Sequence, residues 1–161
     1  MEFVEPVESI TLWYKLLEET QERMGFTMYP AVEQYLAGML NEYVSRADIK
    51  NTIFADEWLN ALGKSGALTK WKLRDVGDKA LLYAGFFPKR AQRLNVDVRY
   101  FQEIGMSAYH HAHQAFEDER GQVFLRLSRE FVFLKKFLWV MRGEADVLHL
   151  ISTGVQSTIF H

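Results

Sequence analysis

The sequence predicts an all-α, single-domain bundle of five or six helices spanning residues 1–161. Apolar residues recur at the 3.6-residue spacing of an amphipathic helix over long stretches. The three prolines, Pro6, Pro30 and Pro88, each lie where such a pattern starts or stops, as their missing N–H and fixed φ require. With 48% apolar residues and no cysteine, the chain can fill a core without disulfides or Cys-bound zinc.

The charge balance and the first residues limit the classes of partner and compartment. A net charge of −2 argues against extensive binding of nucleic acid or anionic membrane. The opening residues, MEFVEPVESI, lack the basic segment and apolar run of a secretory signal. The longest apolar run, residues 80–88, is about half of the roughly 20 residues that span a membrane. We therefore expect a cytoplasmic protein without a membrane span.

The first two helices are predicted over residues 8–24 and 30–46. Gly25 can end the first, because glycine readily adopts the left-handed conformation found beyond a helix C-terminus. Pro30 can open the second, since the first helical position needs no N–H. The predicted buried sides consist of Ile10, Trp13, Tyr14, Leu17 and Met24 in the first helix, and of Val32, Leu36, Met39, Leu40 and Tyr43 in the second.

A third helix is predicted over residues 68–87, with Gly77, Ala80 and Ala84 on one face. A glycine inside a helix costs about 1 kcal/mol relative to alanine, so its presence needs a reason. Small residues at these intervals let another backbone approach closely. We therefore expect a neighbouring helix to pack on this face. Pro88 ends the pattern, and a basic linker follows over residues 89–95.

A fourth helix is predicted over residues 97–116, with Asp97 as its N-cap. A fifth is predicted over residues 122–141, where no glycine or proline interrupts the pattern. Shorter helices are expected near residues 55–62 and 145–151, and a polar C-terminal tail over 152–161. The predicted inward faces consist of Phe101, Ile104, Ala108, Ala112 and Ala115 in the fourth helix, and of Val123, Leu127, Phe131, Leu134, Leu138 and Met141 in the fifth.

Residues 77–109, GDKALLYAGFFPKRAQRLNVDVRYFQEIGMSAY, resemble the central segment of a family of uncharacterised bacterial proteins of similar length. The shared pattern is a Gly-Asp helix ending in a Gly-Phe-Phe stop, a Val-Asp-Val turn and a helix that carries Tyr, Gly and Ala-Tyr. The matching positions are Gly77, Asp78, Gly85, Phe86, Phe87, Val96, Asp97, Val98, Tyr100, Gly105, Ala108 and Tyr109. The resemblance implies a bacterial origin and carries over no activity or catalytic residue.

Residues 108–119, AYHHAHQAFEDE, hold the candidate metal ligands His110, His113 and Glu117. On a helix, the i,i+3 and i,i+4 spacings could place two imidazoles and a carboxylate around Zn²⁺ or another divalent ion. The inward stripe of the same helix lies on the opposite side, so the sequence favours a solvated polar face. We therefore predict no cofactor, with a divalent metal as the alternative.

Other chemical patterns favour ordinary surface roles. Asp75 and Asp78 could form a carboxylate pair for acid–base work or Mg²⁺, but an exposed face of alternating charges is the favoured interpretation. The GKS at residues 63–65 does not match a phosphate-binding loop, because Trp58 stands where that motif needs glycine. Trp71 lies among Lys70, Lys72 and Arg74, a combination that nucleic acid could use.

The fifth helix carries a second apolar seam, Leu125, Val132 and Trp139, at intervals of seven residues. Phe133 and Val140 lie beside it. Seven-residue spacing keeps a seam on one face of a helix. A helix with two apolar faces must lie in the middle of the bundle or present one face to a partner chain.

These patterns favour a non-catalytic helical protein-interaction or regulatory module that self-associates, as a homodimer, through the seam. A metal-binding protein or metalloenzyme using the His/Glu cluster is one alternative. A module that binds a small apolar ligand between its helices, or nucleic acid, is another.

Overall fold

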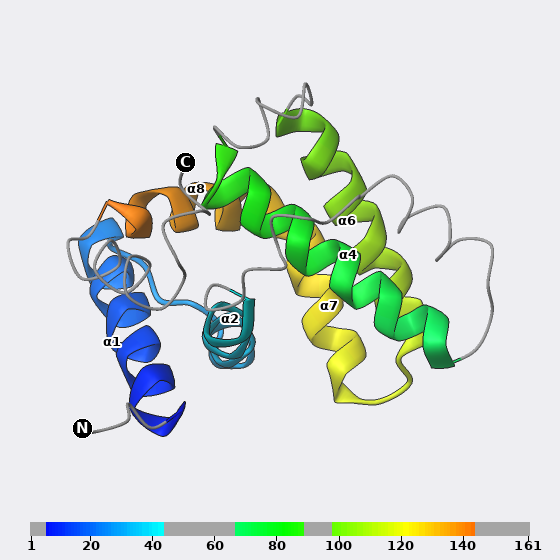
Figure 1. The fold of residues 1–161 in the computed structure, drawn as a ribbon, viewed down its shortest axis with the longest axis horizontal. Helices are drawn as coiled ribbons and strands as arrows, with labels where there is room; N and C mark the ends of the chain where they lie inside the picture. Colours follow the sequence, from blue (N-terminus) through cyan, green and yellow to red (C-terminus); the bar gives the residue numbers. More distant parts are fainter. Residues whose placement is uncertain (1–5, 44–66, 89–97, 144–161) are drawn as a thin grey trace, which may run out of the picture. The chain divides into compact units, whose positions relative to one another are not determined.

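The computed structural model describes residues 6–43, 67–88 and 98–143. This part of the chain forms six α-helices and no strand, which confirms the predicted all-α bundle (Figure 1). The helices are α1 (Pro6–Met24), α2 (Pro30–Tyr43), α4 (Ala67–Gly85), α6 (Val98–Ala115), α7 (Glu119–Arg129) and α8 (Phe131–Arg142). The predicted short helices at 55–62 and 145–151, the basic linker, the Asp97 cap and the polar tail lie outside the described residues.

The chain divides into two compact units. One comprises residues 1–50 and 140–161, and the other comprises residues 51–139. The first therefore contains α1 and α2, and the second contains α4, α6, α7 and most of α8. A single domain over residues 1–161 stays a prediction.

Helices α1 and α2 pack together in the first unit. As predicted, α1 ends at Gly25, whose φ of 71° is the left-handed conformation that glycine allows, and α2 begins at Pro30. The buried amide of Gln21 accepts a hydrogen bond of 2.6 Å from the backbone N–H of Met28 and donates one of 2.5 Å to Glu33. Gln21 therefore fixes the connection between the two helices.

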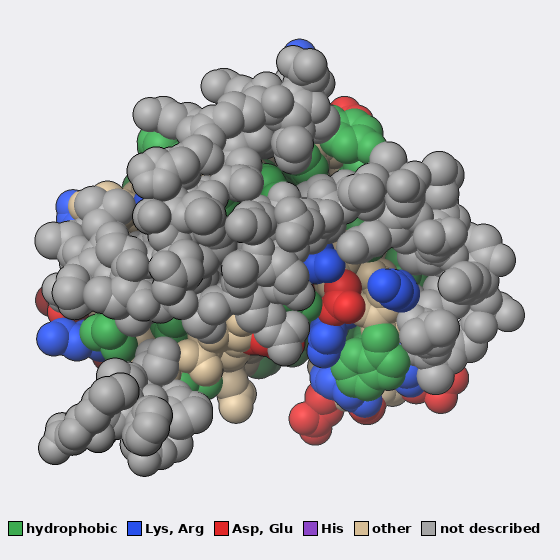
Figure 2. Space-filling view, viewed as in Figure 1, with side chains coloured by type: hydrophobic (Ala, Val, Ile, Leu, Met, Phe, Trp, Pro, Cys, Tyr) green, Lys and Arg blue, Asp and Glu red, His purple; other side chains and the backbone are tan. Residues whose placement is uncertain are grey.

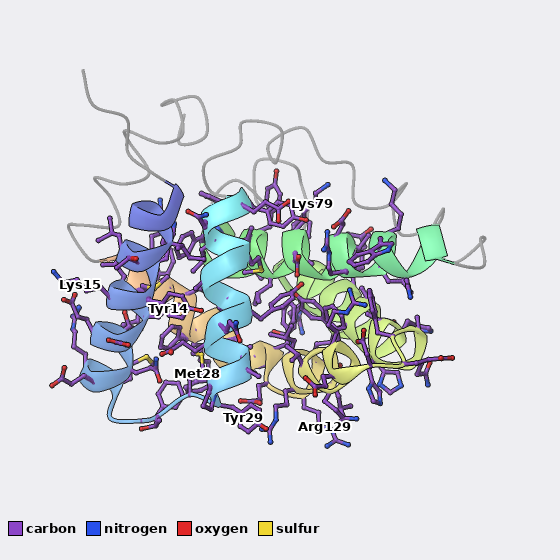
Figure 3. The ribbon with its side chains drawn as sticks, turned by 90° about the horizontal axis from the view of Figure 1, so that it is seen from below. Tyr14, Lys15, Met28, Tyr29, Lys79 and Arg129 are labelled. Carbon is purple, nitrogen blue, oxygen red and sulfur yellow. The ribbon has the colours of Figure 1, made fainter. Side chains whose placement is uncertain are left out.

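The outer side of α1 follows the predicted amphipathic pattern. Lys15 is exposed and lies on the side of α1 away from α2, whereas half-buried Tyr14 lies toward α2 (Figure 3). The buried side also contains two polar residues, Thr20 and Gln21, that the pattern did not predict. Thr20 donates from its hydroxyl to the carbonyl oxygen of Leu16 at 2.8 Å, so burial leaves this group bonded.

In the second unit, α4 packs against α6, and α6 packs against α7 (Figure 1). The small residues of α4 make the first contact possible. A Cβ atom at Gly77 would lie 2.6 Å from carbons of the Tyr109 ring, and one at Gly105 of α6 would lie 3.0 Å from Cβ of Ala80 in α4. The close approach predicted for the glycine-containing face of α4 is confirmed.

Polar contacts join α6 to the helices that follow it. The hydroxyl of Ser128 in α7 donates to the carbonyl oxygen of Met106 at 2.8 Å. The ammonium of Lys135 in α8 donates to the side chain of Gln102 at 2.9 Å. These bonds fix which sides of α7 and α8 face α6.

The predicted fifth helix differs from the structure at both its start and its middle. It begins at Glu119, because the carboxylate of Asp118 accepts the backbone N–H of Arg120 and caps the first turn. It breaks at Glu130, where φ is −98° and ψ is 10°, so the prediction of one uninterrupted helix is wrong. On a continuous helix, Phe124 and Phe137 would point about 140° apart, yet both are buried. The break allows both phenylalanine side chains to face the core. No glycine or proline marks this position in the sequence, because the break depends on tertiary packing.

Candidate functional site

The outer side of α8 exposes several large apolar side chains. Val132 is 36% exposed, Phe133 37% and Trp139 49%, while the opposite side of the helix is buried. These are three of the six large hydrophobic side chains exposed in the described part of the chain, so exposure is concentrated on this helix. We call these three residues, with the exposed Lys136 between them, the α8 outer face.

The predicted seam lies partly on this face. Val132 and Trp139 are seven residues apart and therefore only about 20° apart around the helix, and both are exposed. Leu125 lies on α7, before the break at Glu130, and is half-buried. The sequence pattern thus found two of the exposed residues and also placed Phe133 beside them.

The structure does not bring the three candidate metal ligands together. α6 ends at Ala115, so Glu117 lies beyond the helix and its i,i+4 spacing from His113 no longer places it on the same face. The rings of His110 and His113 are 6.3 Å apart between centroids. Among the described residues, no group of three His, Asp or Glu side chains is arranged to hold a metal ion.

His113 has a structural partner instead. Its Nδ1 lies 2.8 Å from the carbonyl oxygen of Gly121. Because a carbonyl oxygen only accepts, Nδ1 carries the proton in this contact. A Cβ atom at Gly121 would lie 2.5 Å from the carbonyl oxygen of Phe116, so the absence of a side chain there permits the tight α6–α7 connection.

The two candidate carboxylates of α4 have different environments. Asp75 is accessible and forms an ion pair of 2.8 Å with Arg74. Asp78 is 2% exposed and accepts a hydrogen bond of 2.7 Å from the hydroxyl of Tyr109, which is fully buried. The prediction of an exposed face of alternating charges is wrong for Asp78, because the neighbouring Gly77 lets the Tyr109 ring cover it.

A second cluster combines cations with aromatic rings where α4 meets the end of α6 and the start of α7. The rings of Trp71 and Phe116 pack edge-to-face at 5.1 Å. The guanidinium of Arg74 lies 4.9 Å from the Trp71 centroid, and that of Arg120 lies 5.1 Å from it and 4.8 Å from Phe116. The ammonium of Lys70 lies 5.0 Å from Phe116. We call these five side chains the Trp71 cluster.

Sequence reasoning found only part of the Trp71 cluster. Trp71, Lys70 and Arg74 are neighbours in the chain and were recognisable as cations beside an aromatic. Phe116 and Arg120 come from a distant segment, and no local signal connects them to α4. On the face drawn in Figure 2, Lys and Arg side chains surround hydrophobic ones, with Asp or Glu side chains beside them.

The fold defines an all-α protein, and no helix in the described ranges is long and apolar enough to cross a membrane. No family model matches the sequence, and neither a curated protein nor a solved structure matches it. The resemblance of residues 77–109 to a bacterial family stays a prediction.

Proposed function

We propose that this chain is a non-catalytic helical interaction module that self-associates through the α8 outer face. The observation that carries the proposal is the exposure of Val132, Phe133 and Trp139 on one side of a single helix. Burying such side chains stabilises an interface at roughly 25 cal/mol per Å² of apolar surface removed from water. Large aromatic side chains are also enriched among residues that dominate binding energy.

The spacing of the face favours another helix as its partner, and a second copy of this chain supplies one. In an antiparallel pair related by a two-fold axis, Val132 can lie opposite Trp139 of the second copy, and the reverse contact follows by symmetry. Seven-residue spacing keeps both contacts on the same seam. The α8 outer face is thus complementary to a second copy of itself, because the smaller Val132 of each copy lies opposite the larger Trp139 of the other.

Lys136 lies between the two contact points and opposes association only weakly. Its aliphatic stem can cover apolar surface while the ammonium reaches solvent. Two such ammonium groups from paired copies repel each other, and dissolved salt screens that repulsion. The proposal therefore predicts a characteristic dependence on ionic strength, which an acidic partner protein would reverse.

Sedimentation velocity over a wide range of protein concentration tests self-association. We expect a concentration-dependent dimer for the unaltered chain and a monomer for Trp139→Glu, because the substitution places a charge within the seam. The matched control is Tyr100→Glu, which adds the same charge at a comparably exposed aromatic, 38% exposed, on α6. It should leave the dimer unchanged.

The two outcomes that would overturn the proposal are distinct. An unaltered chain that stays monomeric at the highest attainable concentration removes self-association. A dimer that survives Trp139→Glu but not Tyr100→Glu moves the interface away from α8. Circular dichroism of both variants checks that the helices remain folded. From the amino-acid composition, we also propose that the protein resides in the cytoplasm.

A further inference from the structure

The Trp71 cluster gathers three cations around two aromatic rings, and it is independent of the α8 outer face. A guanidinium that lies over an aromatic ring is held there by cation–π attraction. Arg120 lies over both rings and Arg74 over one. Both arginines are therefore held in place before any ligand arrives, which reduces the entropy lost on binding.

The donors of the cluster are only partly used. Arg120 directs Nε and Nη2 at the carboxylate of Asp118, with distances of 2.6 to 3.1 Å. Its Nη1 makes no hydrogen bond to a described residue, and the ammonium of Lys70 has no ion pair within the described ranges. The Arg120 and Asp118 side chains are about half exposed, at 50% and 52%. Ligands can therefore reach these donors from solvent.

In the described part of the chain, two carboxylates form ion pairs with the cations of the cluster. Asp75 pairs with Arg74 and Asp118 pairs with Arg120, while Lys70 forms no ion pair there, although its charge also acts on Asp118. The pKa of Arg120 is raised chiefly by its hydrogen bond to Asp118, and the charge of Arg74 opposes that rise. The two guanidiniums are thus close enough to repel each other. A bound anion would reduce this repulsion and would accept hydrogen bonds from the N–H groups that make none within the described residues.

We propose that the Trp71 cluster binds a phosphate monoester, with Arg120 and Lys70 donating to its oxygens and Arg74 supplying further positive charge. Arg120 can serve this ligand through Nη1, because an N–H of a charged guanidinium forms a strong, charge-assisted hydrogen bond to a phosphate oxygen. A monoester carries close to two negative charges at neutral pH and three acceptor oxygens. It can therefore engage more than one donor of the cluster at once.

The surroundings favour a compact monoester over a polynucleotide. Glu117 and Glu119 are exposed on either side of Asp118, and they would repel a phosphate backbone running past the cluster. The whole chain also carries a net charge of −2. A single phosphate group can sit at the cations without meeting this acidic border.

NMR of the whole 161-residue chain with phenyl phosphate as the probe tests the site through the indole N–H of Trp71, assigned with Trp71→Phe. We expect a saturable shift of this signal in the unaltered chain. Arg120→Gln should weaken binding about tenfold or more, the value of one charge-assisted hydrogen bond. Lys70→Gln, a second variant that breaks no ion pair within the described residues, should also weaken it.

Two matched substitutions distinguish a specific binding site from a general effect of positive charge on the surface. Arg129→Gln removes the same charge at an exposed position on α7 and should leave affinity unchanged. Arg120→Lys keeps the charge but loses Nη1, the donor that Asp118 leaves unused, and it should bind more weakly than the unaltered chain. The proposal is overturned if phenyl phosphate gives no saturable shift, or if Arg129→Gln weakens the binding of phenyl phosphate as much as Arg120→Gln does.

Titrations with two other ligands identify the kind of molecule that carries the phosphate. A phosphoserine peptide that binds more tightly than phenyl phosphate indicates a phosphorylated protein, and the reverse order indicates a small metabolite; both support the site. An oligothymidylate whose affinity rises with its length and exceeds that of both would overturn the monoester proposal in favour of single-stranded nucleic acid. None of these results depends on whether the chain dimerises through α8.

Discussion

The hydroxyl of Tyr109 donates a hydrogen bond of 2.7 Å to the carboxylate of Asp78, joining α6 to α4 inside the unit formed by residues 51–139. Both side chains are buried. A carboxylate removed from water needs hydrogen bonds to replace those it loses. This contact is therefore part of what permits an acidic residue at the helix crossing.

Tyr109→Phe keeps the ring and removes only the donor. We expect the free energy of unfolding to fall by about 1–3 kcal/mol, because a buried carboxylate loses one of its hydrogen bonds. Urea denaturation at neutral pH measures the change. Tyr100→Phe, at an exposed ring of the same helix, is the control and should change stability by less than about 0.5 kcal/mol. Equal effects at the two positions would contradict the structural role of Tyr109.

Two glycine-to-alanine substitutions should have opposite signs. Gly38 lies within α2, and no atom of the described residues lies within 4 Å of an added Cβ, so Gly38→Ala should stabilise by up to about 1 kcal/mol through helix propensity. Gly77→Ala gains the same propensity but forces its Cβ to 2.6 Å from the Tyr109 ring. That ring is anchored by its hydroxyl, and overpacking costs about 1–3 kcal/mol. Thermal unfolding of both variants tests the contrast, and stabilisation by both would disprove the tight α4–α6 contact.

The acid side of the stability profile should depend on Asp118. Its pKa lies below the usual value, chiefly because the Arg120 side chain hydrogen-bonds the carboxylate. A depressed folded-state pKa means that this contribution to stability is present above the pKa of the unfolded chain and is lost as pH falls through the folded one. NMR titration of the carboxyl carbon should give a higher pKa in Arg120→Gln than in the unaltered chain. Arg129→Gln should leave it unchanged, and a shift of equal size there would assign the effect to general charge.

Ionic strength should strengthen self-association. Pairing through the α8 outer face brings two copies of Lys136 together, and salt screens their repulsion. Raising salt from about 0.05 to about 0.5 M should tighten the dimer by about threefold, in keeping with the roughly 0–1 kcal/mol of an exposed charge pair. Lys136→Gln should dimerise more tightly at low salt and lose this dependence, whereas Lys72→Gln on α4 should retain it. A dimer weakened by salt would point to a different interface.

The ring of His113 should be protonated at Nδ1 when neutral, because that nitrogen faces the carbonyl oxygen of Gly121 at 2.8 Å. Long-range ¹H–¹⁵N correlation spectra distinguish the two tautomers. His113→Ala should lower the melting temperature by loosening the α6–α7 connection, and His110→Ala, at an exposed position, is the matched control. Stoichiometric Zn²⁺ binding that both substitutions abolish would instead support a metal site at this position.

Several features of the fold could be predicted from sequence because they depend on neighbouring residues. Gly25 ends α1 through its own backbone freedom, and Pro30 opens α2 through its fixed φ. The glycine-containing face of α4 was recognisable because Gly77 shares it with Ala80 and Ala84, and three small residues on one face permit close packing. Spacing alone predicted that Val132 and Trp139 share one face of a helix, and the structure shows that both are exposed.

The candidate sites depended more on contacts between distant segments. His110 and His113 share a helix with the right spacing for a metal, but α6 ends before Glu117 and so separates the ligand set. Asp78 has the sequence context of a surface charge, yet Tyr109 covers it from another helix. In each case the deciding contact comes from where a helix stops or from what packs on it.

The sequence by itself determined that the chain is helical, where most described helices begin and end, and that Val132 and Trp139 share one side of a helix. Periodicity, proline and glycine control these properties through local backbone geometry. Only the tertiary structure decided that the fifth predicted helix breaks at Glu130, that Asp78 is buried and that Arg120 joins Trp71. These depend on which faces meet when helices pack, and packing is set by the shapes of side chains far apart in the chain.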